Sequence, residues 1–135
     1  MENTAAGIKR ISENPAKEKS YQFALRIVKT YKHLTFEQKE YVLSKQLLRS
    51  GTSIGANIAE ANEAQSKADF VSKLSIALKE TVETEYWLNL LRDSQFLAKS
   101  RADSLLVDCL EMKAILTAAI KTMKLQIENR KWERE

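Results

Sequence analysis

Hydrophobic residues recur at helical spacing along most of the chain. From about Ala16 to His33, an apolar row with the spacing i, i+3, i+4, i+7 predicts a first helix, with a core face formed by Tyr21, Ala24, Leu25 and Val28. A second apolar row lies beside the first and contains Phe23, Ile27 and Tyr31. This width exceeds what one neighbouring helix requires, and it indicates either deeper burial or a surface for another subunit.

The second helix is expected to begin at Thr35, which with Gln38 resembles a capping box, and to end near Ala61. Its predicted core residues are Phe36, Leu43, Leu47, Ile54, Ile58 and Ala61. The seven-residue spacing from Leu47 to Ile54 favours one continuous helix through Gly51 and Gly55. Each glycine costs about 1 kcal/mol relative to alanine inside a helix. A close approach of another backbone would offset that cost.

Two more helices follow. Ser66 with Asp69 predicts the start of the third, which runs to Asp93. Its expected core residues are Phe70, Leu74, Ala77, Leu78, Leu88 and Leu91, and a second apolar patch comprises Ile76, Trp87 and Leu90. After a link over residues 94–100, the fourth helix continues to about Arg130. Its core residues are expected to be Ala102, Leu105, Cys109, Met112, Leu116, Ala119, Ile120, Met123 and Ile127.

Four amphipathic helices with short links predict an all-α fold, an antiparallel up-down-up-down four-helix bundle. The chain contains only 3 Gly and 1 Pro, too few for the turns of a many-stranded β fold. Residues 1–15 are expected to form a flexible arm, residues 16–131 the bundle and residues 132–135 a tail. This topology places Lys17 and Lys19 near the end of the fourth helix.

The net charge of +4 is distributed unevenly. Residues 9–49 contain ten Lys/Arg and four Asp/Glu, residues 50–112 six and ten, and residues 113–135 six and three. A basic face on the first and fourth helices would attract an RNA or DNA backbone. The candidate nucleic-acid-binding residues are Lys17, Lys19, Arg26, Lys29, Lys32, Lys121, Lys124, Arg130 and Lys131.

The residues needed for catalysis or metal binding are scarce. The chain has one histidine, His33, and one cysteine, Cys109, and neither belongs to a recognisable catalytic pair or metal motif. Three carboxylates, Glu80, Glu83 and Glu85, are expected on a solvated helix face. We therefore expect no enzyme activity and no cofactor. The absence of a signal peptide or apolar membrane span favours the cytoplasm.

A row of polar residues follows the predicted second helix beside its core face. It comprises Gln46, Arg49, Ser53, Asn57 and Glu60. Side chains of this kind can pair with a neighbouring helix or subunit and so fix helix register. The alternatives are a nucleic-acid contact and a small-molecule pocket lined by Arg49, Asn57 and Glu60.

Two segments resemble the 23S ribosomal RNA intervening-sequence protein family. The first, RSGTSIGANIAEA, spans residues 49–61 and contains the S-I-x-x-N-I-A-E motif. The second spans residues 69–90 and contains F-x-x-x-L-x-I-A-L-x-x-x-x-E between Phe70 and Glu83. The similarity covers about Ser20 to Met123. One departure is Ala61 with Asn62, where the family commonly has a glycine after the glutamate.

The resemblance implies a homopentameric four-helix bundle, related to the accessory protein of diversity-generating retroelements and without enzyme activity. Candidate oligomer-interface residues are Phe23, Ile27, Tyr31, Ile76, Trp87 and Leu90. Three functions remain open. The chain could bind a nucleic-acid backbone, act only as a protein–protein scaffold for a partner protein, or hold a small ligand.

Overall fold

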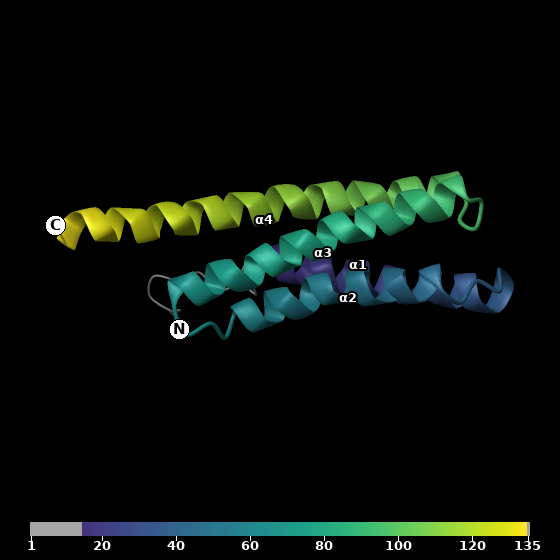
Figure 1. Cartoon of the computed structure of the whole chain (residues 1–135), viewed down its shortest axis with the longest axis horizontal. Helices are drawn as coiled ribbons and strands as arrows, with labels where there is room; N and C mark the ends of the chain where they lie inside the picture. Colours follow the sequence, from purple (N-terminus) through teal and green to yellow (C-terminus); the bar gives the residue numbers. More distant parts are fainter. Residues whose placement is uncertain (1–14, 135) are drawn as a thin grey trace.

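The computed structural model describes residues 15–134, with side chains described over residues 16–130. The helices are α1 (Pro15–Lys32), α2 (Leu43–Ala61), α3 (Lys67–Asp93) and α4 (Lys99–Arg134), and a short π-helix, η2 (His33–Glu37), follows α1. Consecutive helices run in opposite directions, and the C-terminal part of α4 extends beyond the other helices (Figure 1). The predicted all-α four-helix bundle is confirmed. The predicted arm, except Pro15, lies outside the described residues, and α4 continues past the tail boundary expected at residue 131.

The buried positions of α1 and α3 alternate in steps of three and four residues. On α1 they are Ala16, Ser20, Phe23, Ile27 and Thr30, followed by Leu34 in η2, and on α3 they are Phe70, Leu74, Ala77, Thr81, Thr84, Leu88 and Leu91. This spacing keeps one narrow stripe facing the neighbouring helices, as in coiled coils. The bundle core therefore includes hydroxyl side chains as well as hydrophobic ones.

The core face predicted for the first helix is wrong. Phe23 and Ile27 are 1% and 0% exposed, whereas Tyr21, Leu25 and Val28 are 61%, 49% and 37% exposed. The buried stripe contains Ser20 and Thr30, which look polar in the sequence. Each hydroxyl donates to a carbonyl of its own helix, Ser20 to Lys17 at 3.0 Å and Thr30 to Arg26 at 2.9 Å. A hydroxyl satisfied in this way can be buried at little cost.

Helix α2 is continuous through both glycines, as predicted. Gly51 is buried against α1, where an added Cβ would lie 2.8 Å from Cγ1 and 2.9 Å from Cγ2 of Ile27. The absence of a side chain at position 51 therefore lets the two helices pack at this distance. The predicted close approach of another backbone does not occur at Gly51, where the neighbour is a side chain, but at Gly55, where an added Cβ would lie 3.4 Å from the Ser20 carbonyl oxygen.

The predicted start of the second helix is also wrong. Thr35 does not cap a helix, because its hydroxyl donates to the Tyr31 carbonyl at 3.0 Å. The chain instead passes through η2 and a left-handed residue, Lys39 (φ 57°), before α2 begins at Leu43. The Glu40 carboxylate accepts the backbone N–H groups of Val42, Leu43 and Ser44 at 3.1, 2.9 and 2.6 Å. Glu40 thus satisfies the first amides of α2.

The predicted start of the third helix and the predicted core of the fourth helix are confirmed. Ser66 caps α3 by accepting the Asp69 N–H at 3.0 Å. All nine residues predicted for the core of the fourth helix are buried or pack against the core. They include Cys109, and burial, the largest cause, raises the pKa of its thiol to about 12.

Candidate interaction surfaces

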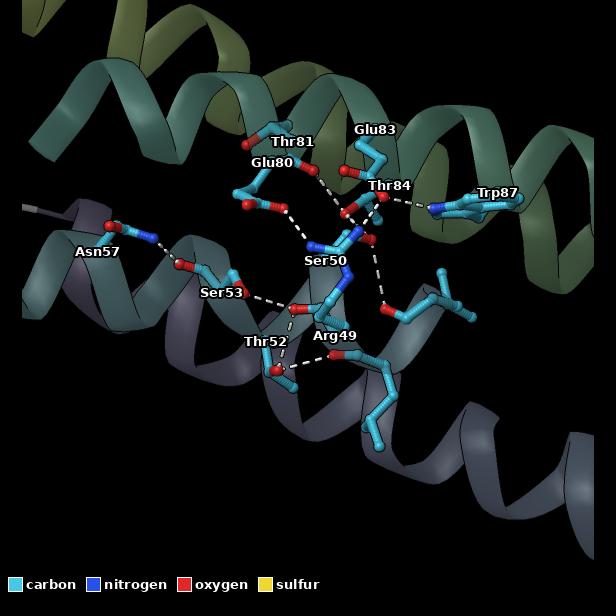
Figure 2. A network of polar contacts seen from close by, with 12 residues as sticks. Arg49, Ser50, Thr52, Ser53, Asn57, Glu80, Thr81, Glu83, Thr84 and Trp87 are labelled. Carbon is cyan, nitrogen blue, oxygen red and sulfur yellow. Dashed lines mark hydrogen bonds and ion pairs between the residues drawn. The ribbon is translucent and has the colours of Figure 1, made fainter. Parts of the chain in front are cut away.

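Arg49, a member of the polar row of α2, points toward α3 (Figure 2). The Arg49 guanidinium donates to Glu80 at 3.3 Å and to Glu83, and the Trp87 indole N–H donates to the same Glu83 carboxylate at 2.9 Å. Below this network, the buried hydroxyls of Ser50 and Thr84 lie 2.9 Å apart. Arg49 therefore joins α2 to α3 beside a buried polar contact.

The rest of the row is divided between two roles. Ser53 and Asn57 donate back to carbonyls of α2, at 2.6 and 2.9 Å, whereas Glu60 pairs with Lys73 of α3 at 3.0 Å. Within the chain, Arg49 and Glu60 therefore pair with a neighbouring helix, whereas Ser53 and Asn57 form their hydrogen bonds within α2. The carboxylates expected to be solvated also have partners, since Glu80 and Glu83 bind Arg49 and Glu85 binds Lys113 at 3.1 Å.

Part of the predicted basic face is neutralised where α1 meets α4. Arg26 forms an ion pair with Asp108 at 2.6 Å and donates to the Ser104 hydroxyl at 2.8 Å. Lys19 pairs with Asp108 at 3.7 Å and with Glu111. These contacts place Lys19 beside the first half of α4, so the predicted position of Lys17 and Lys19 near the end of α4 is wrong. The sequence analysis missed this pairing because the partners are about 80 residues or more apart in the chain.

The other candidate cations lie in separate groups. A pocket of about 460 Å³ at one end of the bundle, hereafter the end pocket, is lined by Lys29, Lys32, His33, Phe36, Glu37 and Arg101. Lys121 and Lys124 line a different groove, of about 280 Å³, next to Leu78 on α3. Lys17 and Arg130 are exposed, and the side chain of Lys131 lies outside the described residues.

Comparison with known proteins shows where the chain belongs. Residues 12–118 match the model of the family described as 23S rRNA-intervening sequence protein. The chain belongs to the 23S rRNA-intervening sequence protein family. It is similar to a 1.70 Å crystal structure of a Bacteroides thetaiotaomicron protein described as having unknown function and belonging to the S23 ribosomal protein family, with 55% identity and a TM-score of 0.79 over 81% of this chain and 97% of that one. No curated protein matches the chain.

This family member has exposed hydrophobic residues on α1 and on the pair of helices α3 and α4. The α1 surface comprises Tyr21, Leu25 and Val28, and the α3/α4 surface comprises Val82 and Tyr86 of α3 with Val107 and Leu110 of α4. The members of each pair on α3 and α4 are one turn apart. The ion pair between Glu85 and Lys113 brings these parts of the two helices to a similar level.

The predicted interface residues are mostly occupied within the chain itself. Phe23 and Ile27 are wrong as surface residues, because both are buried between the helices. Tyr31, Trp87 and Leu90 are half-buried, and Ile76 is exposed. Trp87 packs against the core and lies edge-on to Tyr86, with ring centroids 5.0 Å apart. The exposed hydrophobic residues on α1 are those that the sequence analysis had assigned to the core.

Two features of the described residues bear on other functions. No helix among residues 15–134 is long and apolar enough to cross a membrane. Among the side chains of residues 16–130, no three His, Cys, Asp or Glu are grouped as a metal site would require. The sequence analysis missed two members of the end pocket, Phe36 and Arg101. Phe36 was assigned to the core because its spacing fits a helix that begins at Thr35, and Arg101 belongs to the acidic middle of the chain.

Proposed function

We propose that the chain is a non-enzymatic cytoplasmic protein that assembles into a homo-oligomer and acts as a binding scaffold. The main support is the exposed hydrophobic residues on α1 and on α3 and α4, because apolar surface that one subunit leaves uncovered can be buried by association. Membership of the family adds the expectation of five subunits that the sequence resemblance carried.

A ring of five copies needs two different surfaces on each copy. A self-complementary contact pairs subunits two by two, so rings with an odd number of subunits require a contact between unlike surfaces. The α1 surface and the α3/α4 surface lie on different helices and could meet in this way. In the proposed ring, the α1 surface of each subunit packs on the α3/α4 surface of the next.

Light scattering of single-charge variants tests this arrangement. Leu25→Glu removes one half of the contact and Leu110→Glu the other half, so each variant alone should be monomeric at micromolar concentration. An equimolar mixture retains one intact contact per pair and should form 1:1 dimers that cannot grow. Gln65→Glu, in the link between α2 and α3, places the same charge at an exposed position outside both surfaces and should leave the oligomer unchanged. A monomeric wild-type protein, or a mixture that stays monomeric, contradicts the proposal.

Nucleic-acid binding is a second proposed function, supported by cations that have no ion-pair partner in the described part of the chain. Lys29, Lys32 and Arg101 form one such group, and Lys121 with Lys124 forms another. Contacts of this kind are driven by counterion release, so affinity for RNA should fall steeply with salt and show little sequence preference. Retention on immobilised RNA at two salt concentrations is the measurement. A protein–protein scaffold that binds no nucleic acid would show no salt-dependent retention.

A small-ligand function has less support. The structure contains a cavity of about 670 Å³ between α1 and α2, lined by residues that include Tyr21, Ala24 and Gly55. None of Arg49, Asn57 and Glu60, which were the candidates for a ligand pocket, contributes to this cavity. Arg49 and Glu60 are engaged with α3 instead.

A further inference from the structure

The end pocket combines unpaired cations with an exposed aromatic ring. Lys29 and Lys32 come from the last turn of α1, Arg101 comes from the first turn of α4, and Phe36 of η2 lies at the same pocket. Phe36 is 71% exposed, although the preceding residues of η2, Leu34 and Thr35, are buried. A large aromatic ring left in solvent beside positive charge is a feature that core packing does not explain.

The local backbone accounts for the outward position of Phe36. In η2, Leu34 is fully buried and Thr35 is also buried, with its hydroxyl tied to α1. The π-helix ends with the Gln38 N–H donating to the His33 carbonyl at 3.2 Å, and the chain then turns through left-handed Lys39. Leu34 and Thr35 therefore hold the segment to the bundle while Phe36 stays on the surface. Short π-helical turns recur at functional sites.

The lining of the end pocket also carries a net positive charge. No ion pair to Lys29, Lys32 or Arg101 occurs among residues 16–130, in contrast to Arg26 on the same helix, which is paired with Asp108. Glu37 is the one carboxylate in the lining, and it pairs with Nδ1 of His33 at 3.1 Å. Three cations therefore face one carboxylate that already has a partner. The ligand that fits the end pocket is a flexible polyanion that carries planar apolar groups.

We propose that the end pocket binds single-stranded nucleic acid, with backbone phosphates on Lys29, Lys32 and Arg101 and an unpaired base stacked on Phe36. Proteins that bind single strands combine a basic groove with aromatic rings on which bases stack. A base inside a duplex is stacked on both faces and is not free to cover Phe36. The inference rests on the nucleic-acid part of the proposed function and specifies where, and in which form, the nucleic acid binds.

Fluorescence anisotropy with the full-length protein tests the proposal. The probes are a labelled single-stranded oligonucleotide of mixed sequence and the matching duplex, each titrated at several salt concentrations. Replacing Lys29, Lys32 and Arg101 together by Gln should reduce the slope of log affinity against log salt by about 2, since each single-strand phosphate contact contributes roughly 0.7. Phe36→Ala should weaken single-strand binding at least about fivefold without changing that slope. Phe36→Tyr should retain the wild-type affinity.

Matched control variants distinguish binding at the end pocket from general effects of surface charge and hydrophobicity. Lys45→Gln with Lys79→Gln removes two exposed cations that do not line the end pocket, and Tyr41→Ala removes an exposed aromatic ring that does not line it either. If these controls weaken binding as much as the pocket variants do, the inference is wrong. It is also wrong if Phe36→Ala dissociates the oligomer in light scattering while nucleic-acid affinity is unchanged, because the ring would then belong to a subunit contact.

The failure of this inference is distinct from the failure of the broader function. A wild-type protein that binds neither probe at low salt removes the proposed nucleic-acid function together with this site, and it leaves the assembly proposal standing. If the wild-type protein binds both probes and the pocket variants bind them equally well, only the assignment of binding to the end pocket is contradicted. Equal affinity of the wild-type protein for duplex and single strand contradicts the stacking of an unpaired base.

Discussion

Replacing Gly51 by alanine should destabilise the protein, although alanine is the better helix former. A Cβ at position 51 would lie 2.8 Å and 2.9 Å from the two γ carbons of Ile27, closer than carbon atoms in proteins approach. Ile27 is fully buried and β-branched, so it has little freedom to move. Overpacking of this kind costs about 1–3 kcal/mol, and the helix preference for alanine returns about 1 kcal/mol.

The net loss expected for Gly51→Ala is therefore about 1 kcal/mol, or a fall of roughly 4 °C in Tm for a domain of this size. Gly55→Ala is the matched control on the same helix. Its Cβ would lie 3.3 Å from the Ser20 hydroxyl oxygen and 3.5 Å from the Ser20 Cβ, which requires only a slight adjustment. That variant should be neutral or more stable, by up to about 1 kcal/mol.

A double-mutant cycle identifies the cause. Ile27→Ala alone should cost about 2–5 kcal/mol because it leaves a cavity beside Gly51. In that background the methyl group of Gly51→Ala fills part of the cavity, so the second substitution should become stabilising. Thermal and urea unfolding of the four proteins give the coupling, expected to be at least about 1 kcal/mol. Equal stabilisation by Gly51→Ala and Gly55→Ala would refute the close contact between α1 and α2.

Two further predictions concern Glu40 and Cys109. Burial opposes the charge of Glu40, but the N–H donors of Leu43, Ser44 and Val42 outweigh it and hold the pKa below its ordinary value of 4.5. The carboxylate therefore stabilises the fold fully above pH 4.5, and the effect is lost as the pH falls through the lowered pKa. Glu40→Gln should lower the free energy of unfolding by about 1 kcal/mol at neutral pH. The difference in Tm between this variant and the wild type should vanish in acid. A Tm difference that does not depend on pH would contradict the capping role. Cys109 is buried, and its pKa is raised to about 12. A thiol reagent at pH 8 should therefore label it only in unfolded molecules, so the labelling rate should rise with the fraction that urea unfolds. Rapid labelling of the folded protein would contradict its burial.

The sequence by itself determined the helical class and most of the packing of α2, α3 and α4. The predicted core residues of each of these helices share one face, so a single orientation of the helix buries them together. The cap at Ser66 was also predictable, because a hydroxyl and the amide three residues later are neighbours in any helix that starts there. The continuity of α2 through Gly51 followed from the same periodicity.

Tertiary structure alone decided the orientation of α1 and the position of its charges. α1 has two apolar rows, and the buried one contains Ser20, which a count of hydrophobic residues treats as polar. The row with Ile27 was selected because Gly51 on α2 admits its side chain. The ion pair of Arg26 with Asp108 joins residues 82 positions apart, which no local pattern can predict. The hydrophobic surface on α1 and the end pocket both follow from this orientation, because burying one row leaves the other, and its neighbouring lysines, in solvent.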